Sequence, residues 1–306
     1  MQVLEVGNNV VLLRFLPDNR RLVLVTADDE RKVTFQVMSL SGGERVQLYV
    51  PDAELDAWWY HAWYGNAIEV HPNGESCYVA WGGRLYCFRT ADGESLPTPR
   101  ELPANQVILA PDGTRLVVGF RTHGASPEIS GLAADTSGGS ILWRKTPAKE
   151  FSQVAGFLPD GERFVTIEEV VRIRSFATGD QLAIGRTKPV GSQQPRVSRD
   201  GRYLAAMGYG SMYFWDLTTL EKPRKISGSS NFGDFRSFAF HPGGKTVAVI
   251  HGGPTLIKLY ELETLKCIQK WNWKLGPLQS VAFSPDGTLG AAGSNDGRVV
   301  VWDVDA

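Results

Sequence analysis

The sequence is short of the features that mark secreted and membrane-spanning proteins. Only three of its 306 residues are cysteine, and Cys77, Cys87 and Cys267 stand in strand-like runs, so we expect buried thiols in a reducing compartment. No stretch approaches the ~20 apolar residues that span a bilayer. The N-terminal MQVLEVG has no basic leader before a long apolar run. We therefore expect a cytoplasmic protein with no membrane partner.

A charge excess of one sign is also missing. The 32 Lys and Arg nearly balance the 33 Asp and Glu, which leaves a net charge of −1. Without a basic field to hold a phosphate backbone, nucleic acid is not an expected partner. Hydrophobic residues at 42% and charged residues at 21% are ordinary for a globular protein that buries a sizeable core.

Motifs of catalysis and of metal or cofactor binding are lacking too. No two His or Cys have metal-ligand spacing, and no Gly-x-Ser-x-Gly elbow occurs. GYG at 208–210 is not followed by a helix, as a phosphate-binding loop would be. The acidic stretches 28–30 and 168–169 could hold a cation, but exposed acidic loops are the simpler interpretation. We expect no cofactor, no metal and no enzymatic activity.

What the sequence does contain is a turn tetrad that recurs seven times between apolar runs. The tetrads are LPDN at 16–19, HPNG at 71–74, APDG at 110–113, LPDG at 158–161, SRDG at 198–201, HPGG at 241–244 and SPDG at 284–287. Proline presets φ, Asp or Asn bonds to nearby backbone, and Gly takes the positive φ that closes a hairpin. The flanking runs alternate and are rich in β-branched and aromatic residues. Four runs per repeat of roughly 43 residues predict one propeller blade.

The repeats resemble those of the WD-repeat β-propeller family. The last repeat, SVAFSPDGTLGAAGSNDGRVVVWDV, matches the family pattern over nearly its full length, and the fifth, PRVSRDGRYLAAMGYGSMYFWDLTTLEKP, matches well. The Trp-Asp dipeptide is kept at Trp215-Asp216 and Trp302-Asp303, whereas other repeats have Met38-Ser39, Phe88-Arg89, Arg174-Ser175 and Tyr260-Glu261 there. The resemblance implies an all-β, seven-bladed β-propeller with four-stranded antiparallel blades.

The two ends of the chain are predicted to complete the ring. VVVWDVDA is the third strand of the seventh repeat with no fourth, and MQVLEVG is a surplus strand before the first repeat. Pairing these two segments closes the propeller and leaves no open sheet edge between them. We therefore predict a single domain over residues 1–306, which by itself is a monomer.

Loop length differs between the two faces of the predicted propeller. The tetrads connect first and second strands on one face, the turn face, so His71 and His241 in two tetrads are expected to be structural. The second-to-third-strand loops and the blade connections lie on the other face, the loop face, and loops on a rigid scaffold usually carry binding function. Candidate partner-binding residues are the aromatic and histidine side chains of the loop face: Tyr60, His61, Tyr64, Trp81, His123, Tyr209, Phe232, His251, Trp271 and Trp273.

The longest excess on the loop face is the insertion 51–66, which holds three tryptophans. Leu55, Trp58, Trp59, Ala62 and Trp63 recur at the spacing of one helix face, which predicts a short helix packed over the propeller. In the alternative register, residues 58–60 extend the outer strand and residues 51–57 form the loop. Both interpretations leave some of Tyr60, His61 and Tyr64 exposed.

These features, with the family resemblance, favour a non-catalytic scaffold that binds a protein or peptide on its loop face. Tyr and Trp are enriched at the energetic centres of such interfaces. A propeller with a small-molecule, metal or hydrolytic site at the pore mouth is the alternative, because loops of several blades converge there. Carbohydrate binding by exposed tryptophan is a third hypothesis.

Overall fold

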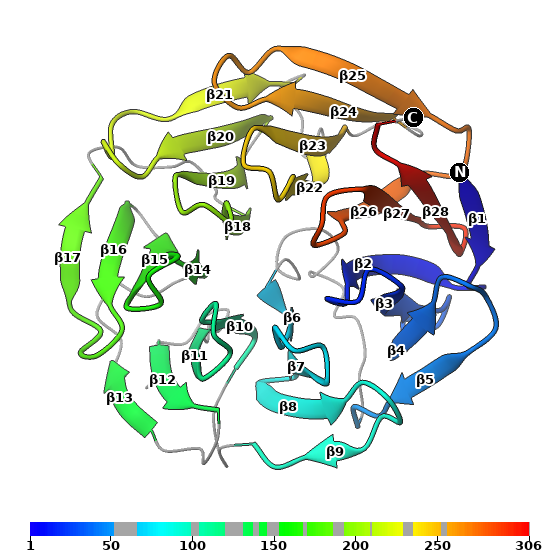
Figure 1. The fold of residues 1–306 in the computed structure, drawn as a ribbon, viewed down its shortest axis with the longest axis horizontal. Coiled ribbons are helices and arrows are strands. Elements are labelled where there is room, and N and C mark those ends of the chain that lie inside the picture. The colour runs from blue at the N-terminus through cyan, green and yellow to red at the C-terminus, as the bar shows by residue number, and fades with distance from the viewer. Residues whose placement is uncertain are drawn as a thin grey trace.

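The protein is described by a computed structural model over residues 1–51, 66–98, 104–119, 131–136, 141–145, 153–167, 170–185, 193–208, 210–228, 235–251 and 256–305. Within these ranges the regular structure is entirely β-strand. Seven four-stranded antiparallel sheets stand in a ring, each running outward from the centre (Figure 1). This arrangement confirms the predicted all-β, seven-bladed propeller. No helix within the described ranges is long and apolar enough to cross a membrane.

Blades one to four follow the chain in order, each from the innermost strand outward. The first contains β2 (Asn9–Phe15), β3 (Arg21–Ala27), β4 (Val33–Ser39) and β5 (Arg45–Leu48). The second contains β6 (Ile68–Val70), β7 (Ser76–Trp81), β8 (Arg84–Arg89) and β9 (Ser95–Leu96). The third contains β10 (Gln106–Leu109), β11 (Arg115–Gly119), β12 (Gly131–Asp135) and β13 (Ile141–Lys145). The fourth contains β14 (Gln153–Phe157), β15 (Arg163–Ile167), β16 (Val171–Ser175) and β17 (Gln181–Ile184).

Blades five to seven complete the ring. The fifth contains β18 (Gln193–Val197), β19 (Tyr203–Gly208), β20 (Ser211–Asp216) and β21 (Arg224–Ser227). The sixth contains β22 (Phe235–Phe240), β23 (Thr246–His251), β24 (Leu256–Glu261) and β25 (Cys267–Asn272). The seventh contains β26 (Leu278–Phe283), β27 (Leu289–Ser294) and β28 (Arg298–Asp303), and its outermost strand is β1 (Gln2–Glu5) from the other end of the chain.

The pairing of β1 with β28 confirms the predicted closure. Gln2 lies opposite Val301 and Glu5 lies opposite Arg298 in an antiparallel register, and the N and C ends lie close together in Figure 1. Two backbone amides that follow β1 also donate to the carbonyl of Gly297. The last blade is therefore completed by residues almost three hundred positions away in the sequence.

Neighbouring tetrads contact one another around the turn face. The glycine of one tetrad packs on a side chain of the tetrad before it, so a Cβ at Gly201 would lie 2.4 Å from Pro159 Cδ. His241 lies against Gly287 in the same way, with its Nε2 3.0 Å from the Gly287 carbonyl oxygen. Glycine is needed at such positions because the backbone takes a positive φ and the neighbouring turn leaves no room. These contacts agree with the structural role predicted for His241.

A second set of contacts joins the outermost strand of one blade to a turn of the next. In each case a side chain donates to a carbonyl in or beside the turn between the third and fourth strands. Three such bonds run from Gln2 Nε2 to Leu40 O at 2.9 Å, from Trp143 Nε1 to Phe176 O at 2.5 Å, and from Arg224 Nη2 to Leu262 O at 2.6 Å. The blades are thus tied near the rim as well as near the axis.

The position of tryptophan in the Trp-Asp dipeptide is buried in every blade. Its occupants, none more than 6% exposed, are Met38, Phe88, Ala134, Arg174, Trp215, Tyr260 and Trp302. A buried guanidinium must be hydrogen-bonded, and Arg174 donates from Nε to Thr166 Oγ1 and from Nη1 to the Gly179 carbonyl. The blade core therefore requires burial at this position and accepts several side chains.

The cysteines depart from the prediction at one position. Cys77 and Cys87 are buried free thiols on β7 and β8, as expected, but Cys267 is exposed, so the prediction of three buried thiols was wrong there. Cys267 begins β25, and the outermost strand of a blade packs less completely than the inner strands. Burial raises the pKa of the Cys77 thiol to about 12.

Most of the insertion 51–66 lies outside the described residues, and so do both interpretations of its helix or strand. Its last residue, Asn66, is 2% exposed and reaches across the ring. Asn66 Nδ2 donates to the carbonyls of Val154 at 2.5 Å and Pro195 at 3.0 Å, on the innermost strands of blades four and five. The chain therefore enters blade two from a position close to the propeller axis.

Candidate functional site

Four of the predicted partner-binding residues lie in the described part of the chain: Trp81, His251, Trp271 and Trp273. The other six, Tyr60, His61, Tyr64, His123, Tyr209 and Phe232, lie outside it. The described four belong to two separate regions of the ring, because Trp81 is in blade two and the other three are in or just after blade six. The structure does not bring Trp81 together with the others.

Trp81 ends β7 and packs between the first two blades. It is 8% exposed, and its ring meets Phe35 edge-on with centroids 5.2 Å apart. Both side chains belong to one core cluster that joins blades one and two. Within the described residues Trp81 is therefore a core side chain. Sequence alone placed it in a short loop, where burial by the neighbouring blade cannot be recognised.

His251 ends β23 and is held by two aromatic side chains. Its Nε2 lies 2.8 Å from the Tyr260 hydroxyl, and its ring centroid lies 5.0 Å from that of Phe235. Burial raises the pKa of Tyr260 to about 12, and the imidazole tautomer decides which of the two groups donates. His251 is half-buried and fixed in orientation. The arrangement fits a structural polar pair within blade six.

Three tryptophans stack where blade six passes into blade seven, and we call them the tryptophan stack: Trp271, Trp273 and Trp302. Trp271 and Trp273 lie nearly parallel with centroids 6.4 Å apart, and Trp273 lies 4.7 Å from Trp302. Trp271 and Trp302 are buried, whereas Trp273 is half-buried in the connection that follows β25. Trp273 is therefore a partly exposed aromatic side chain whose ring is held by the buried rings of Trp271 and Trp302.

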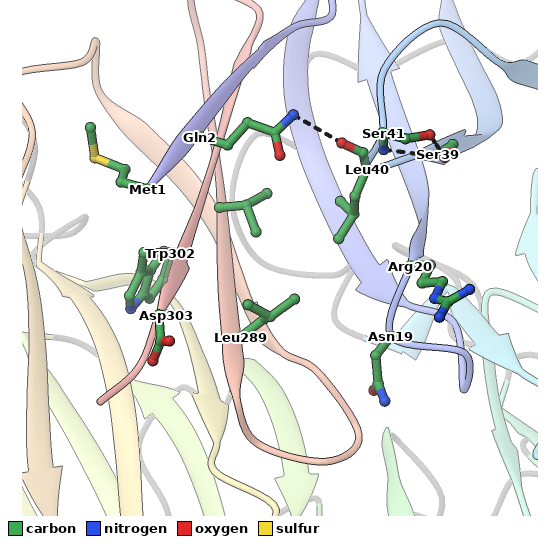
Figure 2. A pocket seen from close by; sticks show the side chains of 11 residues that line it. Met1, Gln2, Asn19, Arg20, Ser39, Leu40, Ser41, Leu289, Trp302 and Asp303 are labelled. Atoms are coloured by element: carbon green, nitrogen blue, oxygen red, sulfur yellow. Dashed lines mark hydrogen bonds between the residues drawn. The ribbon is translucent and has the colours of Figure 1, made fainter. Parts of the chain in front are cut away.

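A cleft on the turn face separates the last blade from the first (Figure 2). It has a volume of about 630 Å³, and its apolar side chains include Leu289 and Leu40. Asn19 of the first tetrad and the following Arg20 lie along its rim, and Gln2 spans it to the Leu40 carbonyl (Figure 2). The cleft combines apolar side chains with neutral groups, one basic residue, Arg20, and one acidic residue, Asp303. It follows the closure of the ring and was not foreseen from the sequence.

A second cavity lies on the propeller axis at the turn face, and we call it the channel pocket. It has a volume of about 360 Å³ and is lined by residues from blades one, five, six and seven. Arg14 on β2, Arg196 on β18 and Arg199 of the fifth tetrad bring three guanidinium groups to it. Sequence analysis missed these arginines. Alignment of the repeats on their tetrads could have found two of them, because Arg14 and Arg196 both stand two residues before a tetrad.

Arg14 of the channel pocket interacts electrostatically with Glu69, and both side chains are half-buried. Glu69 stands two residues before the second tetrad, the position that Arg14 has before the first. Burial raises the pKa of Glu69 to about 7 and lowers the pKa of Arg14 to about 10, and in each case the opposite charge offsets part of the shift. Desolvation is therefore the larger effect on both pKa values, and the attraction between Glu69 and Arg14 cancels only part of it.

Metal-binding residues are not gathered in the part of the chain that the structure describes. No group of three or more His, Cys, Asp and Glu side chains converges there. In the acidic stretch 28–30, the Asp28 carboxylate accepts from the Lys32 amide and Glu30 pairs with Lys32 at 3.0 Å. This stretch closes an exposed turn. The other acidic stretch, 168–169, lies outside the described residues.

Comparisons with known proteins agree with the architecture. The family model described as WD domain, G-beta repeat matches residues 265–303, which run from the start of β25 to the end of β28. The chain is also similar to a Serine-threonine kinase receptor-associated protein of Dictyostelium discoideum, with 28% identity over 132 residues. That alignment spans 43% of this chain and 43% of the relative. The chain thus folds as a seven-bladed β-propeller, and its last repeat is similar to the WD repeat.

Proposed function

We propose that this chain is a non-catalytic scaffold that binds a protein or peptide through its loop face. The family and the relative both suggest an interaction scaffold. The relative's name describes association with a serine-threonine kinase receptor, and we carry over only the general class, a protein partner. The alternative of a hydrolytic or metal site has no comparable support among the described residues.

The observation that carries the proposal is the tryptophan stack. Trp273 lies in a blade connection on the loop face and is half-buried, and Trp271 and Trp302 hold its ring in place. A rigid aromatic side chain loses little conformational freedom on binding, which suits it to the centre of an interface. The tetrads of the turn face, in contrast, are engaged with one another.

Site-specific photocrosslinking tests which face binds. A photoreactive phenylalanine analogue is placed at Trp273 in one variant and at Glu221, an exposed residue on the turn face, in a matched variant. We expect the Trp273 variant to crosslink a protein that the Glu221 variant does not. A crosslink confined to Glu221 would contradict the choice of face.

The captured partner then allows a quantitative test with purified components. Trp273→Ala should weaken its binding by about 2 kcal/mol, the threshold of an interface hot spot. Glu221→Ala should leave the affinity unchanged. Equal affinities for the Trp273→Ala variant and the unmodified chain, both checked for folding by circular dichroism, would refute the role of the stack.

The proposal includes a monomeric chain that works in a reducing cytoplasm without nucleic acid. A net charge of −1 and the free, buried thiols of Cys77 and Cys87 support this setting. Light scattering of the purified chain tests whether it is a monomer, and microscopy of the tagged protein in cells tests whether it is cytoplasmic. A stable dimer or an organelle pattern would contradict them.

A further inference from the structure

The channel pocket owes its volume to small side chains at one repeated position. In blades one, five, six and seven, the residue two positions before the tetrad lies on the innermost strand and lines the pocket. Blades six and seven have Ala239 and Ala282 there, whereas blades one and five have Arg14 and Arg196. The two arginines therefore border a space that the two alanines leave open. The pocket is lined by the innermost strands of four blades, β2, β18, β22 and β26, and these strands come together at the axis of the ring.

The mouth of the pocket is spanned by a third arginine. Arg199 belongs to the fifth tetrad, and its Nη1 donates to the carbonyl of Pro285 in the seventh tetrad at 2.9 Å. This bond crosses the position of blade six, so the guanidinium lies over the opening. None of the described residues that line the pocket is acidic. Its three charged groups are therefore all positive.

Arg196, which lines the pocket, has one guanidinium donor without an acceptor among the described residues. Arg196 Nη2 is buried and makes no hydrogen bond there. A buried charged donor without an acceptor is costly, and a bound ion or a water molecule is the kind of partner that satisfies it. Arg14 is oriented by a bond from its Nη1 to the Leu13 carbonyl at 2.8 Å, which keeps this guanidinium in place at the pocket wall.

We propose that the channel pocket binds a small, multiply charged oxyanion of the phosphate or pyrophosphate class. Guanidinium groups match the geometry of phosphate oxygens and bind them through paired hydrogen bonds. The lining holds three positive groups and no carboxylate, and Glu69, which is not part of the lining, offsets only part of the burial effect at Arg14. This charge suits an anion of more than one charge. The narrow position on the axis, behind the ring of tetrads, favours a small anion over a polymer. The site lies on the face opposite the proposed partner surface, so either proposal can fail without the other.

Isothermal titration of the purified chain with sodium pyrophosphate and with inorganic phosphate, at constant ionic strength set with chloride, tests the site. We expect saturable binding at one site per chain. Arg196→Gln should weaken binding about tenfold or more, and Arg199→Gln should also weaken it. The exposed Arg84 on β8 is the matched control, and Arg84→Gln should leave the affinity unchanged. Citrate in a parallel titration distinguishes a phosphate site from a general polycarboxylate site.

The variants differ in their risk to folding. Arg199 is exposed, so Arg199→Gln should keep the melting temperature and report on binding alone even if Arg196→Gln is destabilised. The proposal is overturned if pyrophosphate shows no saturable binding, or if Arg199→Gln and Arg196→Gln both bind as the unmodified chain does. A loss in Arg84→Gln equal to that in the pocket variants would also overturn it. Tighter binding of citrate than of pyrophosphate would overturn the assignment to phosphate.

Discussion

Strand β1 closes the propeller, and one buried side chain in it offers a direct test of that role. Leu4 is 8% exposed and shares a core cluster with Val299 and Val301 of β28. Its neighbour Val3 is 38% exposed, because successive side chains of a strand point to opposite faces. Replacement of each by Ala therefore compares a buried and an exposed position on the same strand.

The expected magnitude follows from the burial. Loss of the buried part of a leucine side chain costs about 1.5–3 kcal/mol in transfer free energy, and the residual cavity brings the total to about 2–4 kcal/mol. A strand at a chain terminus can shift to fill part of the cavity, which favours the lower half of that range. Val3→Ala should cost less than about 1 kcal/mol.

Urea unfolding followed by tryptophan fluorescence measures both variants. A lower midpoint at an unchanged slope for Leu4→Ala, with Val3→Ala near the unmodified chain, is the expected result. Equal midpoints for the two variants would refute the reasoning, since β1 would then contribute no buried side chain. Deletion of residues 1–6 extends the test, because it removes the whole β1 ladder and leaves β28 as an open edge. We expect that variant to aggregate in size-exclusion chromatography, and a stable monomer would contradict the closure.

Three further predictions follow from the turns, the thiols and the channel. Gly201→Ala should be destabilising by about 1–3 kcal/mol more than Gly82→Ala, because both glycines have positive φ but only the first meets a neighbouring blade; similar melting temperatures would argue against interlocked tetrads. A thiol reagent at neutral pH should label Cys267 rapidly in the native protein and Cys77 and Cys87 only after unfolding, since both are buried and burial raises their thiol pKa values; loss of native labelling in Cys267→Ala is the control. Glu69 has a folded pKa of about 7, above its ordinary value of 4.5, so its contribution to stability is present below pH 4.5 and is lost as the pH rises toward 7. Glu69→Gln should therefore gain stability relative to the unmodified chain over that interval in urea titrations, and a difference that does not change with pH would contradict the assignment.

Turn chemistry made much of the fold predictable. A tetrad such as SPDG specifies its hairpin through residues only a few positions apart, so seven of them define seven strand pairs without any knowledge of distant contacts. Closure of the ring could be predicted from the number of strands, because the seventh repeat lacks its fourth strand and one extra strand precedes the first repeat. The structural role predicted for His241 rested on its place in a tetrad, because repeats place equivalent residues in equivalent surroundings, and its imidazole lies against Gly287.

The candidate site was harder to predict, because burial is decided between blades. Trp81 and Trp273 are both aromatic residues at strand ends, and their local sequences do not distinguish them. Phe35 of the preceding blade covers the first, whereas the second stays partly exposed on top of Trp271 and Trp302. Cys267 shows the same limit, since its exposure depends on its place at the rim.

The sequence by itself determined the number of blades, their turns and the pairing of the two ends, since these depend on local backbone preferences repeated along the chain. Only the tertiary structure decided which aromatic side chains are buried and where the charges of the channel meet. Arg14 and Arg196 are separated by four blades along the chain and border one cavity only because the ring closes. Alignment on the tetrads shows that the two arginines hold equivalent positions, but their approach to one cavity depends on how the blades pack together around the axis.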